Sequence, residues 1–301
     1  MRWTKRGRIF EPAGQAPWIV THAALAVVDP IDQGYRVYFC SRDQHGRSQI
    51  GYGHLTIEDS VTRLDRISPA AVLRPGPLGA FDDAGVTSAC LVHHSGRSLL
   101  YYTGWSRGVS VPFYLQIGVA VSEDDAEYRR ISLAPLLDRS AVDPYLTASP
   151  WIIVEGSLWR MWYVSGTGWE NVDGQIRHSY HIRYAESHDG LFWTRTGVVC
   201  IDYAAGEFAF GRPCVIFDKE LGRYRMWYSV RGDTYRLGYA ESDDGIVWER
   251  RDWDAGLSPS ADGWDSEMLT YPVVFDDRGT LHMLYNGNGY GRTGIGMATL
   301  S

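Results

Sequence analysis

The sequence predicts an all-β protein, a closed five-bladed β-propeller built from four-stranded antiparallel blades. Three observations support this fold class: a four-strand motif recurs along the 301 residues, its last copy lacks the fourth strand, and a matching strand occurs at the N-terminus. Repeats of this kind indicate units that bury their core only against their neighbours. Because the repeat fills the chain, we expect one domain over residues 1–301.

The clearest copy of the motif runs from Arg212 to Arg251. It contains four runs rich in β-branched and aromatic residues: Pro213–Phe217, Tyr224–Val230, Arg236–Glu241 and Ile246–Arg250. Short alternating runs between turn residues are typical of antiparallel strands joined as hairpins. The other copies cover residues 22–67, 87–131, 149–197 and 271–300.

The last copy, residues 271–300, ends after three strands. At the other end of the chain, Trp3–Gly7 resembles Trp193–Gly197, which is the fourth strand of its own copy. We therefore expect the N-terminal strand to join the last blade and close the ring. Closure of this kind removes the open sheet edges that make β-proteins aggregate.

Composition and charge narrow the choice of partners. A formal net charge of −7 and a pI near 5.7 argue against a nucleic-acid or membrane surface, which needs a basic stripe. No stretch approaches the ~18 apolar residues of a membrane span, and the N-terminus lacks the apolar segment of a signal peptide, so we expect a cytoplasmic protein. The sequence pattern does not indicate an oligomeric state. We expect no metal and no cofactor, because the four cysteines lack the spacing of a metal site. We expect these cysteines to be free, buried thiols: Cys40, Cys90, Cys200 and Cys214.

One face of the predicted ring collects polar side chains. In each blade the start of the first strand, the end of the second and the start of the third lie on the same side, around one mouth of the central channel. The segments there are rich in arginine, carboxylate, amide and tryptophan, which suits a polyhydroxylated and anionic ligand. We expect these residues to bind substrate: His22, Arg42, Asp43, Trp105, Arg107, Trp169, Arg212, Arg231, Asn286 and Asn288.

Each of these assignments has a structural alternative. His22 either orients a ligand group, occupies a metal position in the channel, or only supports the fold. Trp105 and Trp169 either stack on a sugar face or brace a loop. The arginines either capture an anion, as guanidinium forks do with carboxylate and phosphate, or pair with acids in their own loops.

Four segments, YRMWYS, GYAESDDGIVW, SGTGW and MLYNGNGYG, carry a resemblance to a known group of proteins. The chain resembles the five-bladed propeller glycoside hydrolase clan, which includes arabinanases, xylosidases, invertases and mannoside phosphorylases. The resemblance implies carboxylates at the inner ends of the first strands of the first three blades. The nearest positions hold His22-Ala23, Ser88-Ala89 and Ala148-Ser149-Pro150, so the acids of the clan are not carried over.

Other acids occur a few residues before the first strands. A glycosidase needs one carboxyl that stays protonated and a second that stays ionised. Glu207 and Glu267 lie six and five residues before a proline that opens a strand run, and we expect them to be the catalytic pair. Asp83 and Asp143 are the next candidates.

Two functions remain open at this point. The first is a glycoside hydrolase, or a related phosphorylase or transferase, that acts on a small saccharide substrate. The second is a propeller that binds a saccharide or another small polar ligand without turnover. For either function, the arginines of the mouth favour an anionic ligand such as a uronic acid glycoside or a phosphorylated sugar.

Overall fold

The computed structural model describes residues 1–58, 62–125 and 127–301. In this part of the chain the secondary structure consists of β-strands and two short 3-10 turns, η1 (Asp252–Asp254) and η2 (Asn288–Gly291). The prediction of an all-β chain is confirmed. Neither helical turn in these ranges is long and apolar enough to cross a membrane.

Antiparallel pairing divides the strands into five consecutive units. Unit 1 comprises β2 (Thr21–Pro30), β3 (Tyr35–Arg42), β4 (Ser48–Ile57) and β5 (Thr62–Asp65). Unit 2 comprises β6 (Gly85–His94), β7 (Arg97–Arg107), β8 (Phe113–Ser122) and β9 (Arg129–Arg130). Unit 3 comprises β10 (Thr147–Glu155), β11 (Leu158–Val172), β12 (Gln175–Ser187) and β13 (Trp193–Ile201).

The last two units follow the same order. Unit 4 comprises β14 (Ala209–Asp218), β15 (Arg223–Arg231), β16 (Tyr235–Ser242) and β17 (Glu249–Arg250). Unit 5 comprises β18 (Thr270–Asp277), β19 (Thr280–Asn286), β20 (Ile295–Leu300) and the N-terminal strand β1 (Trp3–Phe10).

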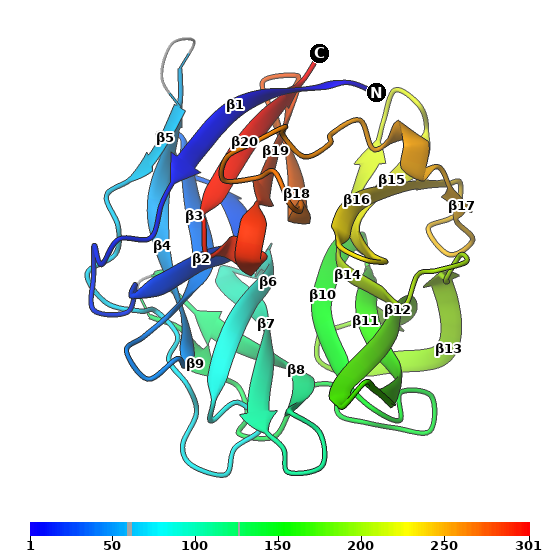
Figure 1. Ribbon diagram of the computed structural model, residues 1–301. Helices are drawn as coiled ribbons and strands as arrows, with labels where there is room; N and C mark the ends of the chain where they lie inside the picture. Colours follow the sequence, from blue (N-terminus) through cyan, green and yellow to red (C-terminus); the bar gives the residue numbers. More distant parts are fainter. Residues whose placement is uncertain (59–61, 126) are drawn as a thin grey trace.

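The units lie side by side around a common centre (Figure 1). Their first strands contact one another in a circle: β2 with β6, β6 with β10, β10 with β14, β14 with β18, and β18 with β2. The hydrogen-bonded sheets themselves do not form one ring. Single parallel bridges, Ser48 with Gly85 and Tyr180 with Ala209, join units 1 and 2 and units 3 and 4, and unit 5 is a separate sheet.

The N-terminal strand joins the last unit, as predicted. β1 runs antiparallel to β20 from the pair Trp3 and Leu300 onward, and the two termini lie close together (Figure 1). Trp3 packs edge-on against Trp227 of unit 4, with ring centroids 6.1 Å apart. The strand therefore contributes core contacts as well as backbone pairing.

Two local predictions were wrong. The fourth strand of unit 4 starts at Glu249 rather than Ile246, because Asp244 accepts the backbone N–H groups of Ile246 and Val247 at 2.8 Å and holds them in a turn. The strand motif also predicts a long loop over residues 166–181, between the second and third strands of unit 3, and this segment is instead a hairpin that extends β11 and β12. Asp173 and Gly174 have φ of 50° and 80°, values that suit the tight turn of such a hairpin.

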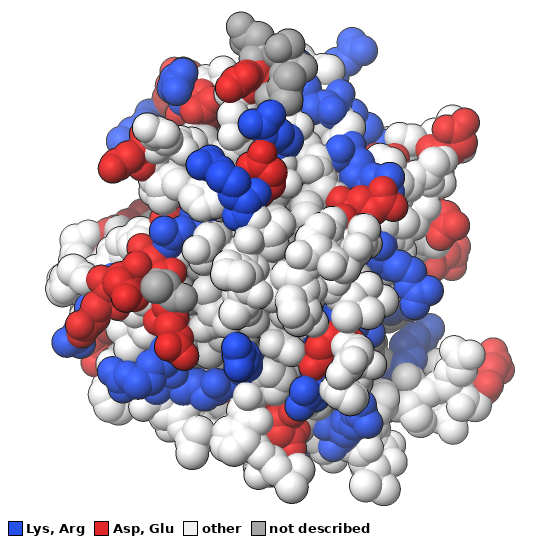
Figure 2. All heavy atoms as spheres, turned by 90° about the vertical axis from the view of Figure 1, so that its left-hand side faces the viewer, with Lys and Arg blue, Asp and Glu red and all other residues white. Residues whose placement is uncertain are grey.

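Buried thiols join neighbouring units. Cys90 accepts the backbone N–H of Ile152 at 3.3 Å, and Cys214 accepts that of Val274 at 3.1 Å. All four cysteines are free and buried, as predicted. On the face shown in Figure 2, basic and acidic side chains are interspersed and neither sign covers the surface alone.

Candidate functional site

Three aspartates that precede first strands share one arrangement. Asp82, Asp143 and Asp265 are buried, and each accepts a hydrogen bond from a tyrosine on the second strand of its own unit. Each also binds a cation from the outermost strand of that unit: Arg130 on β9, Arg195 on β13 and Lys5 on β1. Because the same partners recur in three units, these acids tie the outer strand of a unit to its inner edge.

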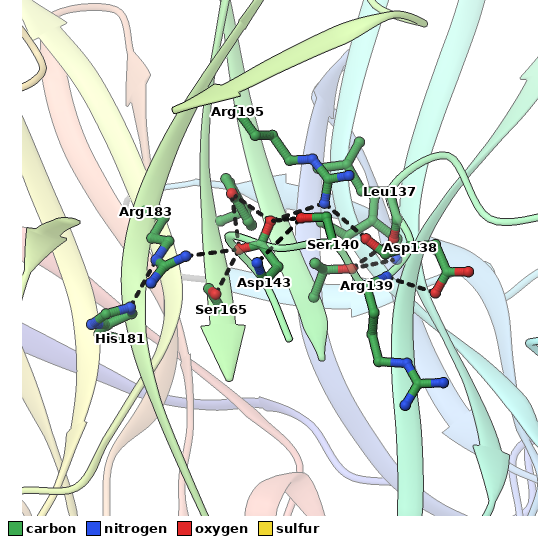
Figure 3. Close-up of polar contacts among 12 residues, drawn as sticks. Leu137, Asp138, Arg139, Ser140, Asp143, Ser165, His181, Arg183 and Arg195 are labelled. Carbon is green, nitrogen blue, oxygen red and sulfur yellow. Dashed lines mark hydrogen bonds and ion pairs between the residues drawn. The ribbon is translucent and has the colours of Figure 1, made fainter. Parts of the chain in front are cut away.

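Figure 3 shows Asp143 between Arg183 and Arg195. The carboxylate accepts the Ser165 hydroxyl at 2.7 Å, and its oxygens lie 2.9 Å from Arg195 Nη1 and 3.4 Å from Arg183 Nη1. The side chain has no exposed surface. A carboxylate with both oxygens engaged and no exposure is suited to holding a unit together, and it offers a substrate no access.

Glu207 takes the corresponding place in unit 4. Arg250 of β17 binds both of its carboxylate oxygens at 2.8 Å. Although burial opposes it, hydrogen bonding to Arg250 holds the pKa of Glu207 below its usual value. A carboxyl with a lowered pKa is ionised at neutral pH and does not serve as a proton donor there.

Glu267, the expected partner of Glu207, is exposed. Within the described ranges its hydrogen bonds are made by the backbone, with Asn288 and Arg236. Neither glutamate lines the two cavities in which other predicted site residues of the described chain gather. The structure therefore does not bring the expected pair together around a common cavity.

Two cavities lie where the predicted site residues gather. The inner cavity has a volume of about 130 Å³, and its polar lining includes His22, Arg42, Ser48, Thr87, Trp105, Tyr271 and Tyr290. No aspartate or glutamate of the described chain lines it. The outer cavity has a volume of about 320 Å³ and is lined by His45, Arg47, Asp83, Ala84, Ser106 and Arg107.

Arg212 extends from β14 across the centre of the molecule. Its Nη1 donates to the Ser88 carbonyl of unit 2 at 3.0 Å, and its Nη2 donates to the Ala26 carbonyl of unit 1. Burial lowers the pKa of Arg212 to about 10, and its Nε has no acceptor in the described structure. Leu25 and Thr87, the residues that precede the two carbonyl acceptors in the chain, line the inner cavity. A buried cation thus lies next to the inner cavity.

Among the described residues, the arginines that were predicted to face the mouth have no acidic partner at ion-pair distance. In the described part of the chain, no ion pair involves any of Arg42, Arg107, Arg212 and Arg231. Asp43, the acid beside Arg42 in sequence, pairs with Arg47 at 3.0 Å instead. Arg231 stacks on two aromatic rings, at 5.2 and 5.4 Å from their centroids. The ion pairs expected under the structural alternative are therefore not formed among the described residues, although Arg212 and Arg231 make other structural contacts.

Three other predicted binding residues are committed to structural contacts. Asn286 joins unit 5 to unit 1, because its amide donates to the Ala23 carbonyl at 2.7 Å. Asn288 accepts the backbone N–H of Glu267 at 2.8 Å. Trp169 packs edge-on against Phe113 of β8 and thereby braces the long hairpin.

The sequence pattern did not predict the two tyrosines of the inner cavity, Tyr271 and Tyr290. Tyr271 had a usable signal, because it precedes a proline in a first strand as Arg212 does. Tyr271 and Arg212 both have positive φ, 56° and 53°, where the register of the first strand shifts. A bulge of this kind re-aims a side chain. Tyr290 lies in η2, which the strand motif did not predict.

His22 is under the influence of two guanidinium groups. Burial, followed by the positive charges of Arg42 and Arg292, lowers the pKa of His22 to about 4. The imidazole is therefore neutral at pH 7, with one nitrogen able to donate and the other able to accept a hydrogen bond. The inner cavity thus combines uncompensated positive charge with neutral hydrogen-bonding groups.

Solved structures with this architecture identify the fold. A structure described as a glycoside hydrolase matches with a TM-score of 0.76 over 98% of this chain and 90% of its own, at 17% identity. A thermostable family-43 glycoside hydrolase gives 0.68 over 93% and 88%, at 18% identity. A protein from the GH130 family of mannoside phosphorylases gives 0.72 over 100% and 94%, at 15% identity. The fold is that of the propeller glycoside hydrolases, and the predicted resemblance to their clan is confirmed at the level of fold.

Sequence comparison gives the family. The chain is 44% identical over 302 residues to the uncharacterized protein MT1551 of Mycobacterium tuberculosis (strain CDC 1551 / Oshkosh), covering 100% of this chain and 99% of the relative. The uncharacterized protein Rv1502 of strain ATCC 25618 / H37Rv is 43% identical over the same coverage. The protein belongs to the family of these mycobacterial proteins. No family model matches the sequence.

Proposed function

We propose that the protein binds an anionic saccharide at the mouth of the channel. The observation that carries the proposal is the lining of the inner cavity, where Arg42 and His22 lie beside tyrosine, serine and threonine hydroxyls with no carboxylate of the described chain among them. Hydroxyl and imidazole groups suit the hydroxyls of a sugar. Unpaired guanidinium groups suit a carboxylate or phosphate.

The proposal includes the architecture that encloses this site. The circle of contacts among the five first strands supports a closed five-bladed propeller that forms one domain over residues 1–301. Pairing of β1 with β20 supports closure through the N-terminal strand. In such a ring the inner cavity lies at one end of the channel and Arg212 fills the channel beneath it.

Arg212 supports an anionic ligand independently of the cavity lining. Placing a charge in the protein interior without a counter-ion costs several kcal/mol, so a buried guanidinium bound only to carbonyl oxygens favours a nearby anion. A bound carboxylate or phosphate group would offset that charge together with the charge of Arg42. Neutral sugars would leave both charges uncompensated.

Cleavage of a glycosidic bond is the second candidate function, because the structures of this fold include glycoside hydrolases and a family of mannoside phosphorylases. Asp83 is the carboxylate in the best position for it, since it lines the outer cavity. A carboxylate pair is required for the usual mechanism, however, and neither cavity holds two in the described structure. Binding without hydrolysis by a carboxylate pair is therefore the function that the geometry supports better.

Replacement of Arg42 by alanine is expected to weaken the binding of glucuronic acid or glucose 6-phosphate by about ten-fold or more, because a charged hydrogen bond contributes roughly 1.5–3 kcal/mol. Titration calorimetry with these ligands, and with glucose as the neutral counterpart, measures the effect. Binding of the acidic sugars should also weaken as salt rises. Arg129→Ala is the control, because Arg129 is exposed on the outermost strand β9.

Equal affinity for neutral and acidic sugars, unchanged by Arg42→Ala, would contradict the proposal. If the unmodified protein turns over a glycoside and both Glu207→Gln and Glu267→Gln lose this turnover, the function is hydrolysis by the pair predicted from the sequence. The two carboxamide variants are otherwise expected to bind acidic sugars as the unmodified protein does.

Ligand binding is expected to take up a proton at His22. An anion bound near Arg42 offsets the positive charge that lowers the pKa of His22. The pKa, which is about 4 in the free protein, is therefore higher in the complex. At pH values between the His22 pKa of the free protein and that of the complex, the complex holds more protons than the free protein. Affinity therefore increases as pH falls through that window, by up to about ten-fold for each pH unit that the window spans. An NMR titration of the imidazole with and without glucuronic acid tests this. An unchanged pKa in the complex would place the anion elsewhere.

A further inference from the structure

The outer cavity adjoins the inner cavity and is larger. Its lining residues Arg47, Ala84 and Ser106 are the sequence neighbours of Ser48, Gly85 and Trp105, and Ser48 and Trp105 line the inner cavity. The two cavities therefore lie on opposite sides of one short wall between units 1 and 2. The sequence pattern predicted Asp83 and Arg107 as site residues, but it did not predict that they line a second cavity.

The wall is built from two side chains. The Trp105 indole Nε1 donates to the Ser48 hydroxyl at 2.7 Å. A Cβ atom at Gly85 would lie 2.3 Å from both of these atoms, so a side chain at this position would displace them. The glycine allows an aromatic ring to stand at the boundary of the two cavities.

The outer cavity offers groups for both an acid and a hydroxyl. Arg107 takes part in no ion pair among the described residues, whereas Arg47 is already bound by Asp43. Asp83 accepts the backbone N–H of Gly79 at 3.0 Å through one oxygen, and its other oxygen can accept a hydroxyl. Free guanidinium, carboxylate and serine hydroxyl groups together suit a sugar unit that carries an acidic group.

The inner cavity is small for a ligand pocket, whereas the two cavities together have enough volume for one ligand of two units. Typical ligand pockets hold roughly 300–1,000 Å³. The inner cavity alone, at about 130 Å³, is smaller than this range, and it enters the range only when the outer cavity, at about 320 Å³, is added. A ligand that fills both must pass Trp105.

We propose that the ligand is an acidic saccharide of at least two units, with one unit in the inner cavity and an adjoining acidic unit in the outer cavity bound by Arg107. The inference rests on the proposed function. It adds that recognition extends outward between units 1 and 2, and that Trp105 lies between the two bound units.

The test compares a uronic acid monosaccharide with a disaccharide of two uronic acid units, each titrated calorimetrically into the unmodified protein, Arg107→Ala and Arg42→Ala. Arg107→Ala is expected to weaken the disaccharide by about ten-fold or more and to leave the monosaccharide within about two-fold. Arg42→Ala is expected to weaken both. Arg129→Ala again serves as the control, and a disaccharide with a neutral outer unit should bind without sensitivity to Arg107→Ala.

The outcomes separate the two proposals. A disaccharide that binds no more tightly than the monosaccharide, or that is insensitive to Arg107→Ala, overturns the two-cavity inference while acidic monosaccharide binding still supports the proposed function. If glucose 6-phosphate binds and neither the uronic acid monosaccharide nor the uronic acid disaccharide binds, the inference is overturned and the ligand is a phosphorylated sugar. Failure of every acidic sugar overturns both proposals.

Discussion

Deletion of residues 1–10 is expected to unfold the protein or to drive it into aggregates. The deletion removes β1 from β20 and takes away three buried apolar side chains, Trp3, Ile9 and Phe10. Full burial of a large apolar side chain contributes roughly 1.5–3 kcal/mol, so their loss approaches the roughly 5–15 kcal/mol by which a domain is stable. It also exposes the edge of β20 to pairing with other chains. Thermal unfolding and size-exclusion chromatography measure both effects.

Arg8→Ala is the matched control for the deletion, since Arg8 lies on the same strand in an exposed ion pair with Glu11. Such pairs contribute at most about 1 kcal/mol, so this variant should fold normally. A synthetic peptide of residues 1–10 is expected to restore the soluble, folded form of the truncated chain. A truncated protein with an unchanged melting temperature would show that β1 adds nothing to the last unit.

Asp143→Asn is expected to lower the free energy of unfolding by about 3–5 kcal/mol. The carboxamide keeps the size of this residue but leaves Arg183 and Arg195 without their buried counter-charge, and breaking a buried pair in this way is strongly destabilising. Urea denaturation measures the change. At temperatures where the variant is fully folded, its affinity for acidic sugars should be that of the unmodified protein.

Asp138→Asn is the control for this variant, because Asp138 is exposed in the same loop, and its effect should stay within about 0.5 kcal/mol. Unchanged stability of Asp143→Asn, accompanied by loss of turnover on a glycoside, would return Asp143 to the catalytic role predicted from the sequence. The pair of measurements thus separates a structural acid from a catalytic one.

The strands were predictable because the information for them is local and repeated. Alternating runs such as Tyr224–Val230 differ from β15 (Arg223–Arg231) by one residue at each end. The partner of β1 was also predictable, since Trp3–Gly7 repeats a fourth-strand pattern. Errors arose where a side chain captures backbone groups, as Asp244 does. Such capture depends on the rotamer of a single residue, and the strand pattern does not contain it.

The site was harder to predict because position before a strand does not reveal what an acid contacts. Glu207 and Asp143 both precede first strands, as a catalytic carboxylate could, yet each is held by an arginine from the outermost strand of its unit. Those partners lie 43 and 52 residues away in the sequence. The sequence pattern placed Arg212 at the channel, but its burial and its lack of an acidic partner follow only from the packing of three units around it.

The pairing of β1 with β20 also determines when the last unit can form during synthesis. β1 is made before the strands of units 1 to 4, and its partner β20 (Ile295–Leu300) is made after them. At ~5–20 residues per second, roughly a quarter of a minute to a minute passes between the synthesis of β1 and the synthesis of β20. Units 1 to 4 can form while the chain is still growing. The pairing of β1 with β20 cannot form until Ile295–Leu300 has left the ribosome, so unit 5 is completed after the other four.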